Sequence, residues 1–263
     1  MNFSSLLGIL AALAVLVGSV FNVAGKGHNI FLEPHGLLIV FGGSAAASLM
    51  CFPISTFYNT LKVFIRKFLG AYSTRYDTVI AEIVGLAKGA RDNPDYLKTK
   101  SNSIKTHFLR DGIQLLTQGG ISDQAIDMIL QKRALTHFKR NEEDATVFKT
   151  IAKFPPAFGL LGTTLGMIGL LQNLGGADAY KLLGPSMAVG LVATFYGIVV
   201  ANLVLIPIGE NLSKLNKEDE VVREIVMDGI KLIRAREHPL VVEEHLKSYL
   251  LPSERAKLKQ VKV

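Results

Sequence analysis

Two threonines, Thr163 and Thr194, are the side chains whose type and position suggest chemistry inside a membrane. Each lies in a long apolar stretch without a charged residue, Phe154 to Ala177 and Leu182 to Gly209. About 20 apolar residues cross the hydrocarbon core of a bilayer, so both stretches are predicted to span a membrane. A hydroxyl oxygen suits a hard cation such as Na⁺ but holds a proton poorly. Ion-handling spans usually keep an ionisable group. These two have none, so a partner must supply the acid if this chain moves ions.

Small residues continue the helical face of each threonine, at spacings of three and four residues. Such stripes let helix backbones approach closely in lipid. Two interpretations follow: the stripes only pack the helices, with the hydroxyls bonded to their own carbonyls, or the hydroxyls line a narrow polar path. The predicted helix-packing residues are Gly159, Gly162, Gly166, Gly190 and Gly197.

Prolines flank the two spans. Pro155 and Pro156 open the third span, where a proline in the first turn fits easily. Pro207 lies in the last turns of the fourth span, where it frees a backbone carbonyl and permits bending. Pro155 is therefore interpreted as a cap, and Pro156 and Pro207 as hinge candidates.

The composition is that of a polytopic membrane protein, with 49% hydrophobic and 19% charged residues among 263. The net charge of +7 is interpreted as the basic excess of cytoplasmic loops and not as a nucleic-acid surface. The single cysteine, Cys51, excludes a disulfide framework. The six histidines have no paired metal spacing, and no phosphate-binding loop or base–acid pair beside a serine supports a membrane enzyme.

The predicted fold is all-α, with four transmembrane helices and a helical cytoplasmic domain. Residues 1–61 hold the first two spans, from about Phe3 to Gly25 and from about Gly36 to Leu61. Residues 62–153 form a helical loop with sixteen basic and ten acidic side chains. Residues 154–209 hold the third and fourth spans, and residues 210–263 an amphipathic helix and tail, with Val221, Ile225, Gly229 and Leu232 on one face. The basic flanks place the loop, the tail and both termini in the cytoplasm.

Three segments resemble the MotA/PomA family of flagellar stator subunits, within the MotA/TolQ/ExbB superfamily. Phe154-Pro-Pro-Ala-Phe-Gly-Leu-Leu-Gly-Thr-Thr-Leu-Gly-Met-Ile-Gly is similar to the family's third span. Gly184-Pro-Ser-Met-Ala-Val-Gly-Leu-Val-Ala-Thr-Phe-Tyr-Gly is similar to the fourth, and Met227-Asp-Gly-Ile-Lys-Leu-Ile-Arg-Ala-Arg-Glu-His-Pro to the segment after it. The resemblance covers nearly the whole chain and is strongest from Pro155 to Leu250.

The resemblance implies a bacterial inner-membrane subunit that is not an enzyme and has no cofactor besides transported H⁺ or Na⁺. Five copies would surround two single-span MotB- or PomB-type partners anchored to peptidoglycan, whose transmembrane aspartate carries the ion. Ion passage would turn the ring, and cytoplasmic charges would push the rotor protein FliG.

The resemblance also assigns roles by position. Thr163 matches a residue that is threonine in sodium-driven members, and Thr194 the hydroxyl residue beside the channel. Pro156 and Pro207 match the two coupling prolines. Thr163 favours Na⁺, whereas Ala193 stands where sodium-type members have the first threonine of a Thr-Thr pair.

The rotor-facing loop departs from the family pattern. Arg91 matches the family's arginine, but Asp92 replaces a basic residue, and Lys98 and Lys100 fall near the family's acidic cluster. These charges are either a rotor contact with a different charge complement or a solvated face. A related motor for another output, of ExbB/TolQ or phage-defence type, therefore stays an alternative, although ExbB/TolQ relatives commonly have three spans.

Overall fold

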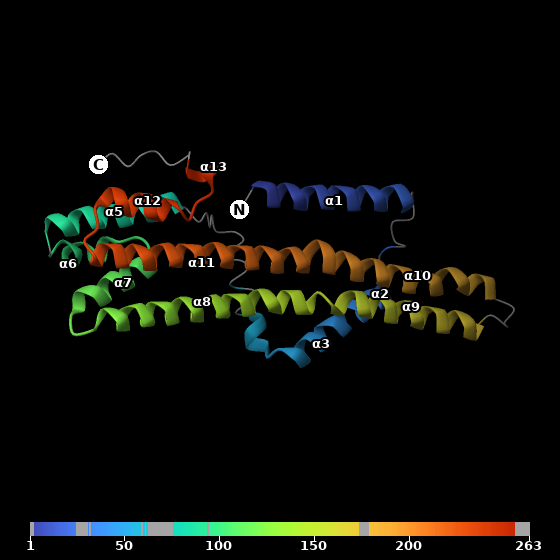
Figure 1. Cartoon of the computed structure of the whole chain (residues 1–263). Helices are drawn as coiled ribbons and strands as arrows, with labels where there is room; N and C mark the ends of the chain where they lie inside the picture. The colour runs from blue at the N-terminus through green and yellow to red at the C-terminus, as the bar shows by residue number, and fades with distance from the viewer. Residues whose placement is uncertain are drawn as a thin grey trace. The chain divides into compact units, whose positions relative to one another are not determined.

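The structure is a computed structural model that describes residues 3–24, 31, 33–58, 60, 62, 76–93, 95–173 and 179–255. In these residues all regular secondary structure is helical, which confirms the all-α prediction (Figure 1). The elements are α1 (Phe3–Ala24), α2 (Pro34–Leu37), the π-helix η2 (Leu38–Gly42), α3 (Gly43–Cys51), α5 (Tyr76–Asp92), α6 (Tyr96–Lys100), the 3₁₀-helix η3 (Ser101–Ser103), α7 (His107–Gln118), α8 (Asp123–Ile151), α9 (Phe154–Asn173), α10 (Ala179–Val199), the π-helix η4 (Val200–Leu205), α11 (Ile206–Arg234), α12 (Pro239–Lys247) and α13 (Pro252–Arg255).

Three helical stretches of the described chain are long and apolar enough to cross a membrane. They are Pro34–Cys51, Asp123–Gln172 and Leu183–Arg234, and they overlap the predicted second, third and fourth spans. The predicted first span corresponds to α1, a helix of 22 residues, and its membrane crossing stays a prediction.

The helix of the second predicted span is interrupted within its predicted bounds. Its helix stops at Cys51 instead of continuing toward Leu61, because Pro53 restricts the residue before it to extended backbone. Phe52 has φ −135° and ψ 138°, which breaks the helix. Helical structure resumes over residues 54–58.

The helix that holds the fourth predicted span continues past Gly209. The helix runs from α10 through η4 into α11 without a break, since Ile206 at the junction keeps right-handed helical dihedral angles. Pro207 lies in the first turn of α11, directly after the π-helical segment. A proline inside a helix lacks an N–H and crowds the carbonyl four residues earlier. The wider π turn relieves that crowding, and such segments are common where helices bend.

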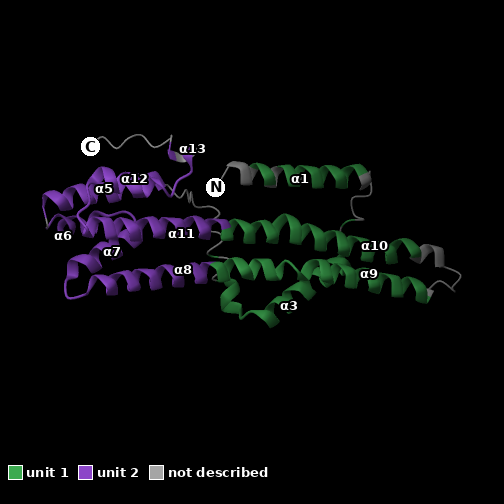
Figure 2. Cartoon of the chain, in the orientation of Figure 1, with its two compact units in different colours: residues 1–72, 142–213 green, residues 73–141, 214–263 purple. Residues whose placement is uncertain are grey.

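The described chain divides into two compact units (Figure 2). Unit 1 comprises residues 1–72 and 142–213, and unit 2 comprises residues 73–141 and 214–263. The core of unit 2 joins α5, α7, α12 and the parts of α8 and α11 that lie in this unit. Its fully buried side chains include Ile83, Leu109, Ile113, Ile225 and Leu246.

Two local features of unit 2 follow directly from the sequence. Gly119 and Gly120 have φ of 71° and 77°, a region that favours glycine, and they end α7 as the Gly-Gly pair predicts. The Ser122 hydroxyl accepts a hydrogen bond from the Ala125 amide at 3.3 Å and caps α8.

The amphipathic tail helix forms as part of α11, with its buried face turned slightly from the predicted one. Ile225 and Gly229 are buried, whereas Val221 and Leu232 are half-buried at the edge. The face is completed by Val222, Val226, Ile230 and Ile233. Tertiary packing thus shifts the centre of the buried face by about one residue from the face predicted from the sequence.

An ion-pair network joins α8 and α11 within unit 2. Arg223 Nε donates to Asp219 Oδ2 at 2.7 Å, and His137 Nδ1 lies 3.2 Å from the same oxygen. Burial alone would raise the pKa of Asp219, but the hydrogen bonds from His137 and Arg223 hold it below the ordinary value. The pKa of Glu224, five residues later on the same helix, is shifted in the other direction, since burial and repulsion by Glu220 and Asp228 raise it.

Asp219→Asn should therefore destabilise the fold, whereas Glu224→Gln should not. A carboxylate whose folded-state pKa is depressed stabilises the protein above its ordinary pKa, and that stabilisation is lost as pH falls through the folded-state pKa. At neutral pH we expect Asp219→Asn to cost about 1.5–3 kcal/mol, the range for hydrogen bonds to charged groups. Glu224→Gln on the same helix should leave the thermal midpoint of the purified protein unchanged or raise it. Equal midpoints for Asp219→Asn and the wild type would contradict this account.

Candidate functional site

The helices α9 and α10 pack against each other in opposite directions, with backbone touching backbone (Figure 1). Residues later in α9 approach residues earlier in α10, as expected for antiparallel helices. They pair Pro155 with Gly197, Gly159 with Thr194, Thr163 with Gly190, and Gly166 with Ser186.

A side chain at the glycines of this contact would collide with the partner helix. A Cβ atom would lie 2.8 Å from Thr163 Cα at Gly190, 2.9 Å from Thr194 Cα at Gly159, and 2.6 Å from the Ser186 carbonyl oxygen at Gly166. These partners are backbone atoms, which cannot move aside as a flexible side chain can. At Gly162 the obstacle is the Ala193 Cβ at 2.6 Å, and at Gly197 it is the Pro155 carbonyl. All five predicted helix-packing glycines thus lie in this contact.

The close contact brings the hydroxyl groups of Thr163 and Thr194 together. Their Oγ1 atoms are 2.6 Å apart. Thr163 Oγ1 is also 2.9 Å from the Gly190 carbonyl and 3.2 Å from the Gly159 carbonyl. Thr194 Oγ1 is 3.1 Å from the same Gly159 carbonyl. We call these two hydroxyl and two carbonyl oxygens the hydroxyl cluster.

The hydroxyl cluster has fewer protons than short contacts. Each hydroxyl has one O–H and two lone pairs, and the carbonyls only accept. Two protons therefore serve four oxygen–oxygen contacts, and two of the contacts have no proton at any instant. Hydroxyl and carbonyl oxygens are the ligands that hard cations take. The cluster can rotate its O–H bonds or present oxygens to a cation, but it contains no group that titrates near neutral pH.

Metal chemistry of another kind has no support in the described residues, which contain no group of three or more His, Cys, Asp or Glu side chains arranged to hold an ion.

The start of the second span adds contacts that the sequence reasoning missed. A Cβ at Gly36 would lie 3.3 Å from both the Ala193 amide nitrogen and the Val189 carbonyl oxygen, so α2 also approaches the α10 backbone closely. The Tyr196 hydroxyl donates to the Phe31 carbonyl, and the rings of Phe31 and Phe195 meet edge to face, with centroids 5.8 Å apart. Residues 36, 40, 44 and 48 are buried, and in the sequence they are Gly, Val, Ser and Ser. This row of mostly small residues at four-residue intervals is the sequence pattern that could have indicated the packing face.

The two hinge candidates lie at different places. Pro156 is half-buried in the first turn of α9, and its Cα would lie 3.1 Å from a Cβ at Gly197, so it belongs to the α9–α10 contact. Pro207 is exposed and lies ten residues beyond Gly197, about 15 Å along the helix axis. Only Pro156 is therefore brought to the packed pair.

The predicted rotor-contact residues lie in unit 2 and are exposed. Arg91 is in the last turn of α5, and Lys98 and Lys100 are in α6. Lys98 Nζ is 3.5 Å from Asp95 Oδ1 in a pair whose side chains are 64% and 78% exposed, so this pair adds little stability.

Gly190→Ala should disrupt the packed pair, because the added methyl group meets backbone. We expect a large loss of folded protein in the membrane and a lower thermal midpoint. Gly184→Ala is the matched control on the same helix, since a Cβ there meets no atom within 4 Å. Similar yield and midpoint for the two variants would show that the close approach is not required.

Comparisons with known proteins place the chain in one family. Residues 100–226 match the model of the MotA/TolQ/ExbB proton channel family. The chain is 32% identical over 256 residues to "Chemotaxis protein PomA" of Vibrio alginolyticus, covering 97% of this chain and 98% of that protein. It is 29% identical to "Motility protein A" of Borreliella burgdorferi, covering 98% and 97%.

Two solved structures share the fold. The C. jejuni MotAB structure matches with a TM-score of 0.84 at 22% identity, covering 96% of this chain and 97% of that one. The flagellar MotAB stator complex from Bacillus subtilis matches with a TM-score of 0.84 at 24% identity, covering 98% and 100%. The family comprises ion-channel and stator subunits of membranes and not enzymes. This chain belongs to the MotA/PomA family of flagellar motor stator subunits.

Proposed function

We propose that this chain is the ring subunit of an ion-driven stator that turns an inward flow of Na⁺ or H⁺ into torque on a rotor. The observation that supports this function best is the hydroxyl cluster, in which two threonine hydroxyls from antiparallel apolar helices lie 2.6 Å apart with no ionisable side chain in α9. The same hydroxyls bond the two helices together, and the oxygens of the cluster outnumber its protons, which leaves lone pairs for a cation.

A partner supplies the missing acid in this proposal. Ion-handling spans depend on an ionisable group, and the two spans here have none. The names of both solved relatives describe complexes of a MotA with a MotB protein. We infer a MotB- or PomB-type partner with one span, a transmembrane aspartate and an anchor on peptidoglycan. Five copies of this chain would surround two such partners.

The proposed coupling ion is Na⁺. Carbonyl and hydroxyl oxygens can replace part of the water around a hard cation, whereas neither kind of group is a good proton carrier.

The proposed topology has four spans in the bacterial inner membrane, with both termini in the cytoplasm. The uncharged helix α1 has 22 residues and a length of about 33 Å, enough to cross the hydrocarbon core. Lys62, Lys149 and Lys153 flank the spans on one side, as expected for cytoplasmic ends.

Thr163→Val and Thr194→Val should each reduce Na⁺-dependent swimming by tenfold or more, in a strain that depends on this chain and its partner. Removing one hydroxyl at a site built to bind it typically costs about 1.4 kcal/mol or more. Thr164→Val is the matched control, because the Thr164 hydroxyl is exposed and bonds to the Leu160 carbonyl of its own helix, 3.0 Å away. Speed is measured against Na⁺ concentration with a protonophore present. Swimming of either cluster variant that equals that of Thr164→Val would rule out the ion-path role, and speed independent of Na⁺ would rule out Na⁺.

The proposed output is torque on FliG through the exposed basic residues of α5 and α6. Arg91, Lys98 and Lys100 would meet an acidic surface of the rotor, since opposite charges steer and orient such contacts. If this surface is only solvated, the stator would drive a non-flagellar process of the ExbB/TolQ or defence type. The observation that supports this alternative is the exposure of Lys98 and Lys100 in α6, where the family has an acidic cluster.

Charge reversal separates the two outputs. Arg91→Glu combined with Lys98→Glu and Lys100→Glu should abolish swimming while leaving ion conduction through the stator intact. Lys139→Glu, an exposed change on α8 in the same unit, should leave swimming unchanged. Normal swimming of the triple variant would refute the rotor contact.

A further inference from the structure

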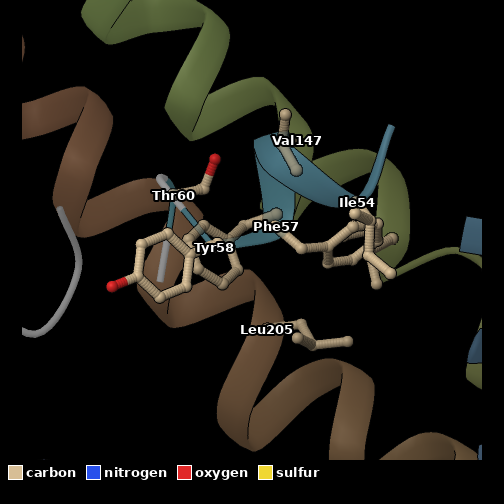
Figure 3. Close-up of a pocket in the computed structure, with 8 residues that line it drawn as sticks. Ile54, Phe57, Tyr58, Thr60, Val147 and Leu205 are labelled. Carbon is tan, nitrogen blue, oxygen red and sulfur yellow. The ribbon is translucent and has the colours of Figure 1, made fainter. Parts of the chain in front are cut away.

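An apolar cavity in unit 1 lies apart from the hydroxyl cluster. Its volume is about 420 Å³. Figure 3 shows lining side chains from three segments, namely the stretch after α3, the end of α8, and η4. Eight residues line it: Ile54, Phe57, Tyr58 and Thr60 after α3, Val147, Phe148 and Ile151 of α8, and Leu205 of η4.

The cavity lies at the level where three spans end together. Ile54 comes three residues after the end of α3, Ile151 three residues before α9 begins, and Leu205 two residues before Pro207. The basic flanks of the same spans mark this level as the cytoplasmic boundary of the bilayer. The cavity therefore opens where acyl chains meet lipid headgroups.

The exposed side chains around the cavity have the composition of a membrane boundary. Ile54 is 75% exposed and Tyr58 is 70% exposed, so the apolar lining continues onto the outer surface. Tyrosine is enriched at this depth because its ring lies in the apolar region while its hydroxyl reaches water.

Two lysines lie close in sequence to the lining of the cavity, beside the ends of the same spans. Lys62 and Lys153 are exposed, and each follows a lining residue, Thr60 or Ile151, by two positions. Two acidic side chains nearby have partners of their own: Glu210 Oε1 is 3.2 Å from Lys149 Nζ, and Asp144 accepts from the buried Thr60 hydroxyl at 3.4 Å. Lysine is depleted in protein–protein interfaces, so these lysines suit a lipid headgroup better than another chain.

We propose that this cavity binds an acyl chain of an anionic phospholipid of the cytoplasmic leaflet, with the lipid phosphate at Lys62 and Lys153. Basic sites between spans on the cytoplasmic side are known to favour anionic headgroups. The inference depends on membrane placement of the chain but not on the ion or the rotor. Its test therefore uses lipid labelling, which can fail without touching the proposed torque function.

Photoactivatable lipids test the site directly. The full chain, purified with its membrane partner, is placed in phosphatidylcholine nanodiscs containing a trace of phosphatidylglycerol or phosphatidylcholine with a diazirine near the acyl terminus. We expect phosphatidylglycerol to label peptides covering residues 54–60 and 147–151 at least about fivefold more than phosphatidylcholine, the effect of one lysine near an anionic group. Lys62→Gln with Lys153→Gln should bring the two probes to parity, whereas Lys139→Gln should preserve the preference.

Filling the cavity tests the acyl-chain part. Leu205→Trp should reduce labelling by phosphatidylglycerol at least severalfold, and Val147→Phe provides a second route if the tryptophan variant does not yield an assembled complex. Equal labelling by the two probes in the wild type would overturn the proposal, since it would mean bulk lipid against an apolar surface. So would a photo-crosslink from a reactive amino acid at Tyr58 to another protein chain, which would identify a second copy or a protein partner as the occupant.

Discussion

Direct contact between the backbones of α9 and α10 is the constraint on which the rest of unit 1 depends. Gly159, Gly166 and Gly190 allow it because a Cβ atom at any of them would lie within 3 Å of backbone on the facing helix. Lipid gives helices no hydrophobic reason to associate, so close packing and interhelical hydrogen bonds must do so. The same closeness brings Thr163 and Thr194 to 2.6 Å. Helix packing and the polar site are therefore one arrangement, and the two interpretations of the small-residue stripes are not exclusive.

The proton count of the hydroxyl cluster limits what these helices can do alone. Thr163 and Thr194 contribute two hydroxyl protons to four close oxygen–oxygen contacts. The other two oxygens are backbone carbonyls, which contribute no proton. Such a site can solvate a cation or reorient its O–H bonds, but it cannot store charge. In the proposed stator, this chain would supply the oxygen ligands and its partner the titrating acid. Such a division would allow the chain to be apolar along its third and fourth spans.

Local sequence patterns predicted three long apolar helices and the packed face of α9 and α10, because glycine spacing, threonine position and a length near 20 residues are properties of single helices. Ends were less predictable. The break at Phe52–Pro53 follows from the preference of the residue before a proline for extended backbone, but the continuous apolar run from Gly36 to Leu61 favoured an uninterrupted span. The continuation of α10 into α11 depends on a π-helical segment that has no clear sequence pattern. Contacts distant in sequence were missed altogether. The hydrogen bond from Tyr196 to Phe31 joins residues 165 apart, and no helical periodicity encodes it.

Each π-helical segment follows a close backbone approach between packed helices. η2 begins two residues after Gly36, which touches the α10 backbone at Ala193, and η4 begins three residues after Gly197, the last close approach of α10. The segments that touch backbone to backbone keep α-helical geometry, and the wider turns follow at their ends. A π-helical segment inside an α-helix commonly marks a bend or a functional position. η4 lies between the hydroxyl cluster and the hinge candidate Pro207, so it is the place in the fourth span where a bend is expected.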